Sequence, residues 1–166
     1  MKLSYIFTLL FMFNNLFASI TCSSEVNNLN FGTYDIYDFS DTNSISDFTV
    51  TCQGQVGNGN NNAPSWLIGL IYNGTEVNVV AYPSEGNSGD SNNRYMTNNI
   101  DNMNYNLYNS SNLQNIFNQN SPININMTLD SSGEKSVTEN YYGSIPNSQK
   151  ISSGVYYDNL NMIIEY

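Results

Sequence analysis

The strongest constraint on the fold lies in the C-terminal segment Leu160–Tyr166. Apolar residues occupy every second position there, at Leu160, Met162, Ile164 and Tyr166. A period of two residues is the pattern of a β-strand that buries one of its faces. The final residue, Tyr166, is an aromatic that is still in phase with the buried face. The pattern therefore raises the question of what covers this strand.

Short alternating segments, separated by Gly, Asn, Ser and Pro, recur along the rest of the chain, and they favour an all-β fold. Phe48, Val50 and Cys52 share one face, which places the sulfur of Cys52 in the core. We interpret the continuous apolar run Trp66–Tyr72 as a strand, with Trp66 inside the core. Seven to nine short strands in a single sandwich-like domain are predicted. The main strand regions expected are 28–39, 44–52, 66–72, 76–82, 94–96, 103–109, 121–130 and 154–166.

The charge of the chain excludes several functions. Its 166 residues include 14 acidic and 4 basic side chains and no His, which gives a net charge of −10. Clustered cations are needed to bind nucleic acid or an anionic membrane, so neither partner is expected. The missing His removes the commonest general base and the commonest zinc ligand. The acidic residues are scattered in turns, so we expect no enzymatic activity, no cofactor and no metal.

The N-terminal segment predicts export. Lys2 precedes the apolar run Tyr5–Phe13, which is too short to span a bilayer, and Ala18 fits the small-residue rule for signal cleavage. Residues 1–18 are therefore expected to be a cleaved signal peptide, followed by one domain over residues 19–166 without membrane insertion. In an exported chain, a lone pair of cysteines is most simply a disulfide, here between Cys22 and Cys52.

Six ordered motifs carry a resemblance that covers essentially the whole mature chain. Together, in this order and spacing, they closely resemble the spore coat protein U domain family, which includes subunits of Csu-type, archaic chaperone–usher pili. The motifs are FGTYD (31–35), VTC (50–52), RYM (94–96), YNLY (105–108), YYGSIP (141–146) and GVYYDNLNMIIEY (154–166).

The resemblance implies an incomplete immunoglobulin-like β-sandwich that lacks its final strand. Subunits of this family borrow a strand first from a periplasmic pilus chaperone and then, at the outer-membrane usher, from the neighbouring pilus subunit. It therefore implies a structural and adhesive pilus subunit that reaches the surface of a Gram-negative cell through the periplasm. Borrowing a strand is β-strand addition, in which backbone hydrogen bonds supply affinity and alternate side chains supply specificity.

Carried over by position, the resemblance assigns residues to the groove that receives the borrowed strand. Leu160, Met162, Ile164 and Tyr166 would form its terminal lip, with Phe31 and Tyr34 near the first strand. Tyr156 and Asp158 match a G-x-Y-x-D motif and are expected to be structural. We expect Tyr156 to fill the core and Asp158 to bond the backbone at a turn.

The sequence departs from the family pattern before the first cysteine. After cleavage at Ala18, only Ser19–Thr21 precede Cys22, and three residues span about 10 Å, too little to fill a neighbour's groove. We therefore expect a subunit that accepts a strand without giving one, at the tip or at the initiating end of a pilus. The alternatives are a non-polymerising secreted surface or coat protein and a glycan-binding sandwich. A core position of Trp66 would count against glycan binding.

Overall fold

The computed structural model describes residues 18–56 and 63–166, so the expected signal segment lies outside the described residues except for Ala18. The described part contains eight strands, one α-helix and one 3-10 turn. The elements are β1 (Ala18–Val26), β2 (Thr42–Val56), α1 (Ser65–Tyr72), β3 (Glu76–Pro83), η1 (Gly86–Ser88), β4 (Arg94–Thr97), β5 (Asn102–Tyr108), β6 (Ile123–Thr128), β7 (Glu134–Ile145) and β8 (Met162–Glu165).

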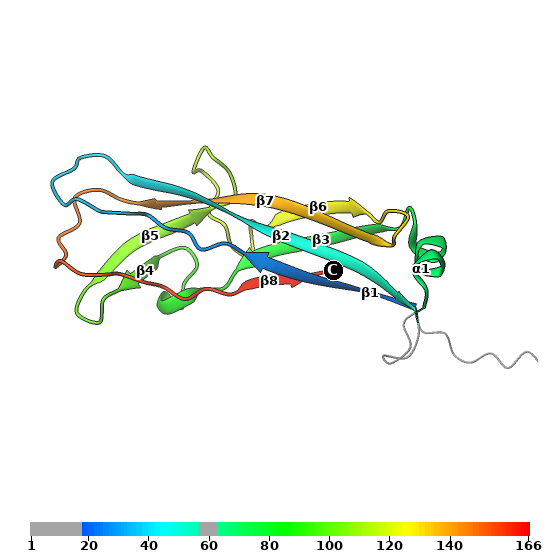
Figure 1. Cartoon of the computed structure of the whole chain (residues 1–166). Helices are drawn as coiled ribbons and strands as arrows, with labels where there is room; N and C mark the ends of the chain where they lie inside the picture. Colours follow the sequence, from blue (N-terminus) through cyan, green and yellow to red (C-terminus); the bar gives the residue numbers. More distant parts are fainter. Residues whose placement is uncertain (1–17, 57–62) are drawn as a thin grey trace, which may run out of the picture.

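The strands form two antiparallel sheets, which confirms the expected immunoglobulin-like β-sandwich. One sheet has the strand order β1-β2-β7-β5-β4, and the other has the order β6-β3-β8. The sandwich is elongated, with its strands along the long axis and α1 at one end (Figure 1). The connection from β1 to β2 and the segment between β7 and β8 lie toward the opposite end.

The core follows from the alternation in the sequence. Phe48 and Val50 of β2 are completely buried, and the ring centroid of Phe48 lies 6.4 Å from those of both Phe117 and Tyr141. On the outer face of the same sheet, the hydroxyls of Thr49 and Thr138 are hydrogen-bonded at 2.8 Å. Apolar residues therefore fill the space between the sheets, while hydroxyl side chains link β2 to β7 on the solvent side.

The apolar run 66–72 is helix α1, so the predicted strand at this position was wrong. A continuous apolar run does not discriminate a strand from a buried helix, because neither period is visible in it. Gly69 and Tyr72, three residues apart, form the buried side of α1. Gly69 packs so closely that a Cβ there would lie 1.9 Å from the carbonyl oxygen of Ser131.

The expected core position of Trp66 was also wrong. Its side chain is 69% exposed, and Leu70, one turn further along α1, is 75% exposed. The helix is held by Tyr72, whose hydroxyl donates to the carbonyl oxygens of Ser19 and Gln55 at 2.9 Å. An aromatic at the last position of the helix, rather than Trp66, therefore anchors this segment.

Residues 28–39, predicted as a strand region, instead belong to the irregular connection between β1 and β2. Local side-chain hydrogen bonds compete with strand pairing here. The carboxamide oxygen of Asn30 accepts from the N–H of Gly32, and a carboxylate oxygen of Asp35 accepts from the N–H of Tyr37, both at 2.9 Å. Gly32, with φ of +72°, adopts the left-handed conformation that suits glycine.

The disulfide between Cys22 and Cys52 is present, as predicted. The two residues are register partners on the adjacent strands β1 and β2, with their Cα atoms 4.1 Å apart. The bond therefore fixes β1 to the sheet near the middle of its length and closes a loop with a sequence separation of 30 residues.

Replacing both Cys22 and Cys52 by Ser is expected to lower the free energy of unfolding by about 3.5 kcal/mol, because the unfolded chain regains the entropy of a 30-residue loop. Urea unfolding at neutral pH measures the change. The wild-type protein unfolded with a reductant is the control and should match the double variant. A loss below about 1 kcal/mol would contradict the prediction.

Candidate functional site

Two sheet edges face the same side of the sandwich. β1 is the outermost strand of the five-stranded sheet, and β8 is the outermost strand of the three-stranded sheet. The two strands lie close together, with the C-terminus beside β1 (Figure 1). Among the pairings of residues 18–56 and 63–166, no ladder joins β1 to β8. Each of these two strands therefore keeps one unpaired backbone edge on this side of the sandwich, which we call the open side.

An apolar groove continues from these edges toward the end of the molecule opposite α1. It contains two adjoining cavities, of about 700 and about 360 Å³, which share Leu29, Phe31, Met96 and Tyr156 in their linings. We call residues 26–36 the N-terminal wall and residues 151–162 the C-terminal wall. The floor consists of six side chains from β4, β5 and β7, namely Met96, Met103, Tyr105, Leu107, Tyr141 and Ile145.

The N-terminal wall is held by side-chain packing onto the floor strands. Phe31 meets Tyr105 edge to face, with ring centroids 5.9 Å apart. Phe31 and Leu29 also lie over Gly143 of β7, where an added Cβ would come within 2.4 Å of Leu29 and 2.6 Å of Phe31. The absence of a side chain at residue 143 thus makes room for this wall.

Tyrosine hydroxyls complete the attachment of the N-terminal wall. The hydroxyl of Tyr34 donates to the carbonyl oxygen of Pro146 at 3.0 Å and accepts from the N–H of Gln149 at 2.8 Å. The hydroxyl of Tyr141 donates to the carbonyl oxygen of Asn27 at 2.7 Å. These bonds join a segment early in the chain to one more than a hundred residues later.

The C-terminal wall is fixed by Asp158. One carboxylate oxygen accepts from the N–H of Asn87 at 2.8 Å, in the turn η1, and the other accepts from the hydroxyl of Tyr105 at 2.7 Å. Burial raises the pKa of Tyr105 far above its usual range, and the bond to Asp158 raises it further. Tyr105 therefore stays a neutral donor. Next to Asp158, Tyr157 exchanges two backbone hydrogen bonds with Thr97 of β4.

Arg94 supports the loop behind this wall rather than lining the groove. It is completely buried, and its guanidinium donates to the carbonyl oxygens of Ser84 and Ser91. Burial lowers the pKa of Arg94, and the negative charge of Asp158 acts in the opposite direction. Ser84 in turn donates its N–H to the carbonyl oxygen of Asn161 at 2.8 Å, so the loop and the C-terminal wall are connected.

The structure places some of the expected groove residues on the groove and others away from it. Phe31, Tyr34, Leu160 and Met162 line the cavities. Ile164, in β8, packs against the core, and neither Ile164 nor Tyr166 lines either cavity. Tyr166 is 60% exposed just after β8.

The two motif residues Tyr156 and Asp158 both lie in the C-terminal wall. Tyr156 is half-buried, lines both cavities and donates its hydroxyl to the carbonyl oxygen of Ser152 at 2.9 Å. Sequence reasoning missed the floor residues as groove residues. The alternation of Met103, Tyr105 and Leu107 identified their buried face, but alternation does not show whether such a face is covered.

Other kinds of site are not found in the described part of the chain. Residues 18–56 and 63–166 contain no group of three or more His, Cys, Asp or Glu side chains placed to hold a metal ion. Within the same ranges, no helix has the length and apolar character needed to cross a membrane. The groove is therefore the main candidate site.

The comparisons with known proteins identify the family and a structure with the same fold. The sequence model of the Spore Coat Protein U domain matches residues 8–163, and the chain belongs to this family. Among curated proteins, none matches the sequence.

One similar solved structure is the crystal structure of the CsuC–CsuE chaperone–tip adhesion subunit pre-assembly complex from archaic chaperone–usher Csu pili of Acinetobacter baumannii. A chain of that complex matches with a TM-score of 0.55 and 15% identity, over 89% of the present chain. The match spans only 40% of that other chain. At this identity the comparison shows a shared fold.

Replacing Gly143 by Ala is expected to destabilise the protein by about 1–3 kcal/mol, because the new methyl group overlaps Leu29 and Phe31. Urea unfolding of the single variant measures the cost. A Phe31→Ala background is the control, since it removes one of the two overlapping side chains and should reduce the cost of the Gly143 change. Equal costs in the two backgrounds would contradict the proposed overlap.

Stability should fall as the pH rises above about 10. Burial is the first cause of the raised pKa of both Tyr105 and Tyr141 in the folded protein. The stabilisation that comes from keeping these two hydroxyls neutral is complete below the pKa of an unfolded tyrosine. At higher pH it is lost, and the free energy of unfolding falls by up to about 1.4 kcal/mol per pH unit for each group. Urea unfolding between pH 8 and pH 11 measures the slope.

The Tyr105→Phe variant should be less stable at pH 8, because Asp158 loses its 2.7 Å donor, yet it should lose less stability between pH 8 and pH 11. Tyr37→Phe, at a site that is 81% exposed, is the matched control and should keep the wild-type slope. A Tyr105→Phe slope equal to the wild-type slope would contradict this assignment.

Proposed function

We propose that this chain is a subunit of a chaperone–usher pilus and that its groove accepts a β-strand from another protein. The open side between β1 and β8, continued by a groove with an apolar floor, is the observation that carries the proposal. Membership of the Spore Coat Protein U domain family supports it. The Csu complex described above, which contains a chaperone and a tip adhesion subunit, supports it through the shared fold.

The chemistry of the groove suits an inserted strand. Its floor presents thioether, aliphatic and aromatic side chains, and alternate residues of an inserted strand would point toward them. Each buried apolar side chain of the donor would contribute about 1.5–3 kcal/mol before entropy losses. An uncovered groove leaves an unpaired edge and exposed apolar surface, both of which promote aggregation. A chaperone that lends a strand would prevent this.

The proposed sequence of partners follows from that requirement. After export and removal of residues 1–18, a periplasmic chaperone would occupy the groove until the outer-membrane usher replaces it with a strand from a neighbouring subunit. The mature chain would then be part of a surface fimbria with a structural and adhesive role. Donor-strand insertion along Leu160 and Met162, with Phe31 and Tyr34 across the groove, is part of this proposal.

We further propose that this subunit occupies a terminal position in the pilus, where it accepts a strand but gives none. Ser19 and Thr21, which precede the first cysteine, are register partners of Gln55 and Gln53 within the chain's own sheet. Residues held in β1 in this way are not free to fill a neighbour's groove. Purified protein should therefore not form homopolymers, and size-exclusion chromatography that showed growing oligomers would contradict the terminal position.

Glycan binding remains the second candidate, and one observation now favours it. Trp66 is 69% exposed on α1, so the argument against glycan binding from a buried Trp66 no longer holds. Exposed aromatic rings can stack on sugar rings. Isothermal titration calorimetry with neutral oligosaccharides tests this function. Binding that is lost in the Trp66→Ala variant would support it, and absence of binding to the wild-type protein would contradict it.

A donor strand appended after Tyr166 through a flexible linker should raise the melting temperature by about 10 °C or more, because filling the groove stabilises only the folded state. The matched control carries the same linker and a donor whose apolar residues are replaced by Asp. Leu160→Asp, on the groove, should remove the gain. Leu70→Asp, on exposed α1, should keep it. An unchanged melting temperature of the fused wild-type chain would overturn the proposal.

A further inference from the structure

A second apolar surface lies at the mouth of the groove, and the groove itself does not account for it. Tyr37 and Phe39, in the connection between β1 and β2, are 81% and 88% exposed. Ile36 beside them is 44% exposed, and Val155 of the C-terminal wall is 84% exposed. Ile36 and Val155 both line the larger cavity, so the exposed surface is continuous with the groove. We call these four residues the rim.

The turn that carries Ile36, Tyr37 and Phe39 of the rim is held in place by local hydrogen bonds. The carboxylate of Asp35 accepts from the N–H of Tyr37, and the backbone N–H of Asp38 donates to the carbonyl oxygen of Asp35. The carboxylate of Asp38 accepts from the N–H and the hydroxyl of Ser40 at 2.9 and 2.8 Å. The two aromatic rings therefore project from a turn that is already formed, which lowers the entropy cost of binding.

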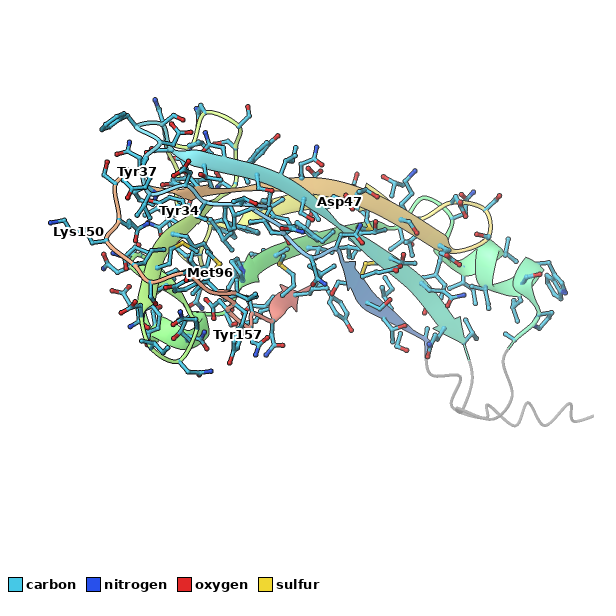
Figure 2. The ribbon with its side chains drawn as sticks, turned by 60° about the vertical axis from the view of Figure 1, so that its left-hand side comes forward. Tyr34, Tyr37, Asp47, Met96, Lys150 and Tyr157 are labelled. Carbon is cyan, nitrogen blue, oxygen red and sulfur yellow. A yellow bond between two sulfur atoms is a disulfide. The ribbon has the colours of Figure 1, made fainter. Side chains whose placement is uncertain are left out.

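The same turn carries negative charge. Asp35, Asp38 and Asp41 lie within seven residues, and the bonds from Ser40 lower the pKa of Asp38, so its carboxylate stays ionised in mildly acidic solution. Lys150 lies at the same end of the molecule as Tyr34 and Tyr37 and offsets part of this charge (Figure 2). A partner that meets the rim would be favoured if it combined apolar and cationic side chains.

We propose that the rim is a second docking surface for the protein that fills the groove, and that this protein is the chaperone, which presents apolar and cationic side chains there. This inference rests on the proposed function, because it presumes that a chaperone strand occupies the groove. The rim would extend the contact from the inserted strand to the body of the chaperone.

Charge argues against a second copy of this chain as the occupant. The chain has a formal net charge of −10 and only four basic side chains, one of which, Arg94, is completely buried. Two copies that met at the acidic turn would repel each other. Charge complementarity with a cationic chaperone surface would instead accelerate association and make its rate depend on salt.

The test uses two probes on the full mature chain: a purified chaperone of a spore coat protein U type pilus that rescues secretion of this chain, and a synthetic peptide of that chaperone's inserted strand. The variants Tyr37→Ser and Phe39→Ser should each weaken binding of the whole chaperone by about tenfold, as expected for exposed aromatic anchors. They should leave peptide binding unchanged. Leu70→Ser, 75% exposed at the other end of the sandwich, is the matched control and should change neither.

Removal of charge tests the electrostatic part separately. Asp35→Asn and Asp38→Asn keep the side-chain oxygen that accepts the turn hydrogen bonds, so the turn should persist. Together they should slow association with the chaperone about threefold or more at low salt and reduce the salt dependence of the rate. Association of the peptide should change less.

The outcomes separate the two proposals. If Leu160→Asp leaves chaperone and peptide binding intact, the groove is not the docking site, and the proposed function fails. If Leu160→Asp abolishes both but the rim variants bind the chaperone like the wild-type protein, only the role of the rim is overturned. Weaker chaperone binding with unchanged peptide binding, for the rim variants alone, supports the inference.

Discussion

The strands β1 and β8 lie at the edges of different sheets, and the groove depends on this arrangement. β1 pairs with β2 in the five-stranded sheet, and β8 pairs with β3 in the three-stranded sheet, so each strand leaves one edge on the same side of the sandwich. The disulfide between Cys22 and Cys52 prevents β1 from leaving β2. Asp158 and Ser84 likewise hold the segment that leads into β8. The open side is thus maintained by a covalent bond and by hydrogen bonds.

Several sheet strands and the disulfide could be predicted because each has a local signal. Strands β1 and β7 were not predicted, because β1 and the first half of β7 are mostly exposed and polar and show no apolar alternation. Alternation located the buried faces of β2, β5 and β6, and export left Cys22 and Cys52 one partner each. The helix α1 could not be distinguished from a strand, because the run Trp66–Tyr72 has no polar residues whose spacing would reveal a helical or a strand periodicity. The helix packs through tertiary contacts that the sequence does not reveal, such as the close approach of Gly69 to Ser131.

The groove could be predicted only in part, for a similar reason. The resemblance placed Leu160, Met162, Phe31 and Tyr34 near it, but its floor depends on how β4, β5 and β7 stack. The sequence around Gly143 did not indicate that Leu29 and Phe31 pack over this residue, although their positions require that it has no side chain. The network of Tyr105, Asp158 and Asn87 joins residues up to 71 positions apart, a separation at which no local pattern operates.

The pairing of β2 with β7 has a mechanical consequence for a protein proposed to sit in a fibre. Register partners run without interruption from Thr42 opposite Ile145 to Gln53 opposite Glu134, along the long axis of the molecule. Tension that pulled β2 and β7 from opposite ends along that axis would shear the two strands past each other. All of these backbone hydrogen bonds would then have to yield together rather than one at a time, with the hydroxyl links of Thr49 and Thr51 adding to the resistance.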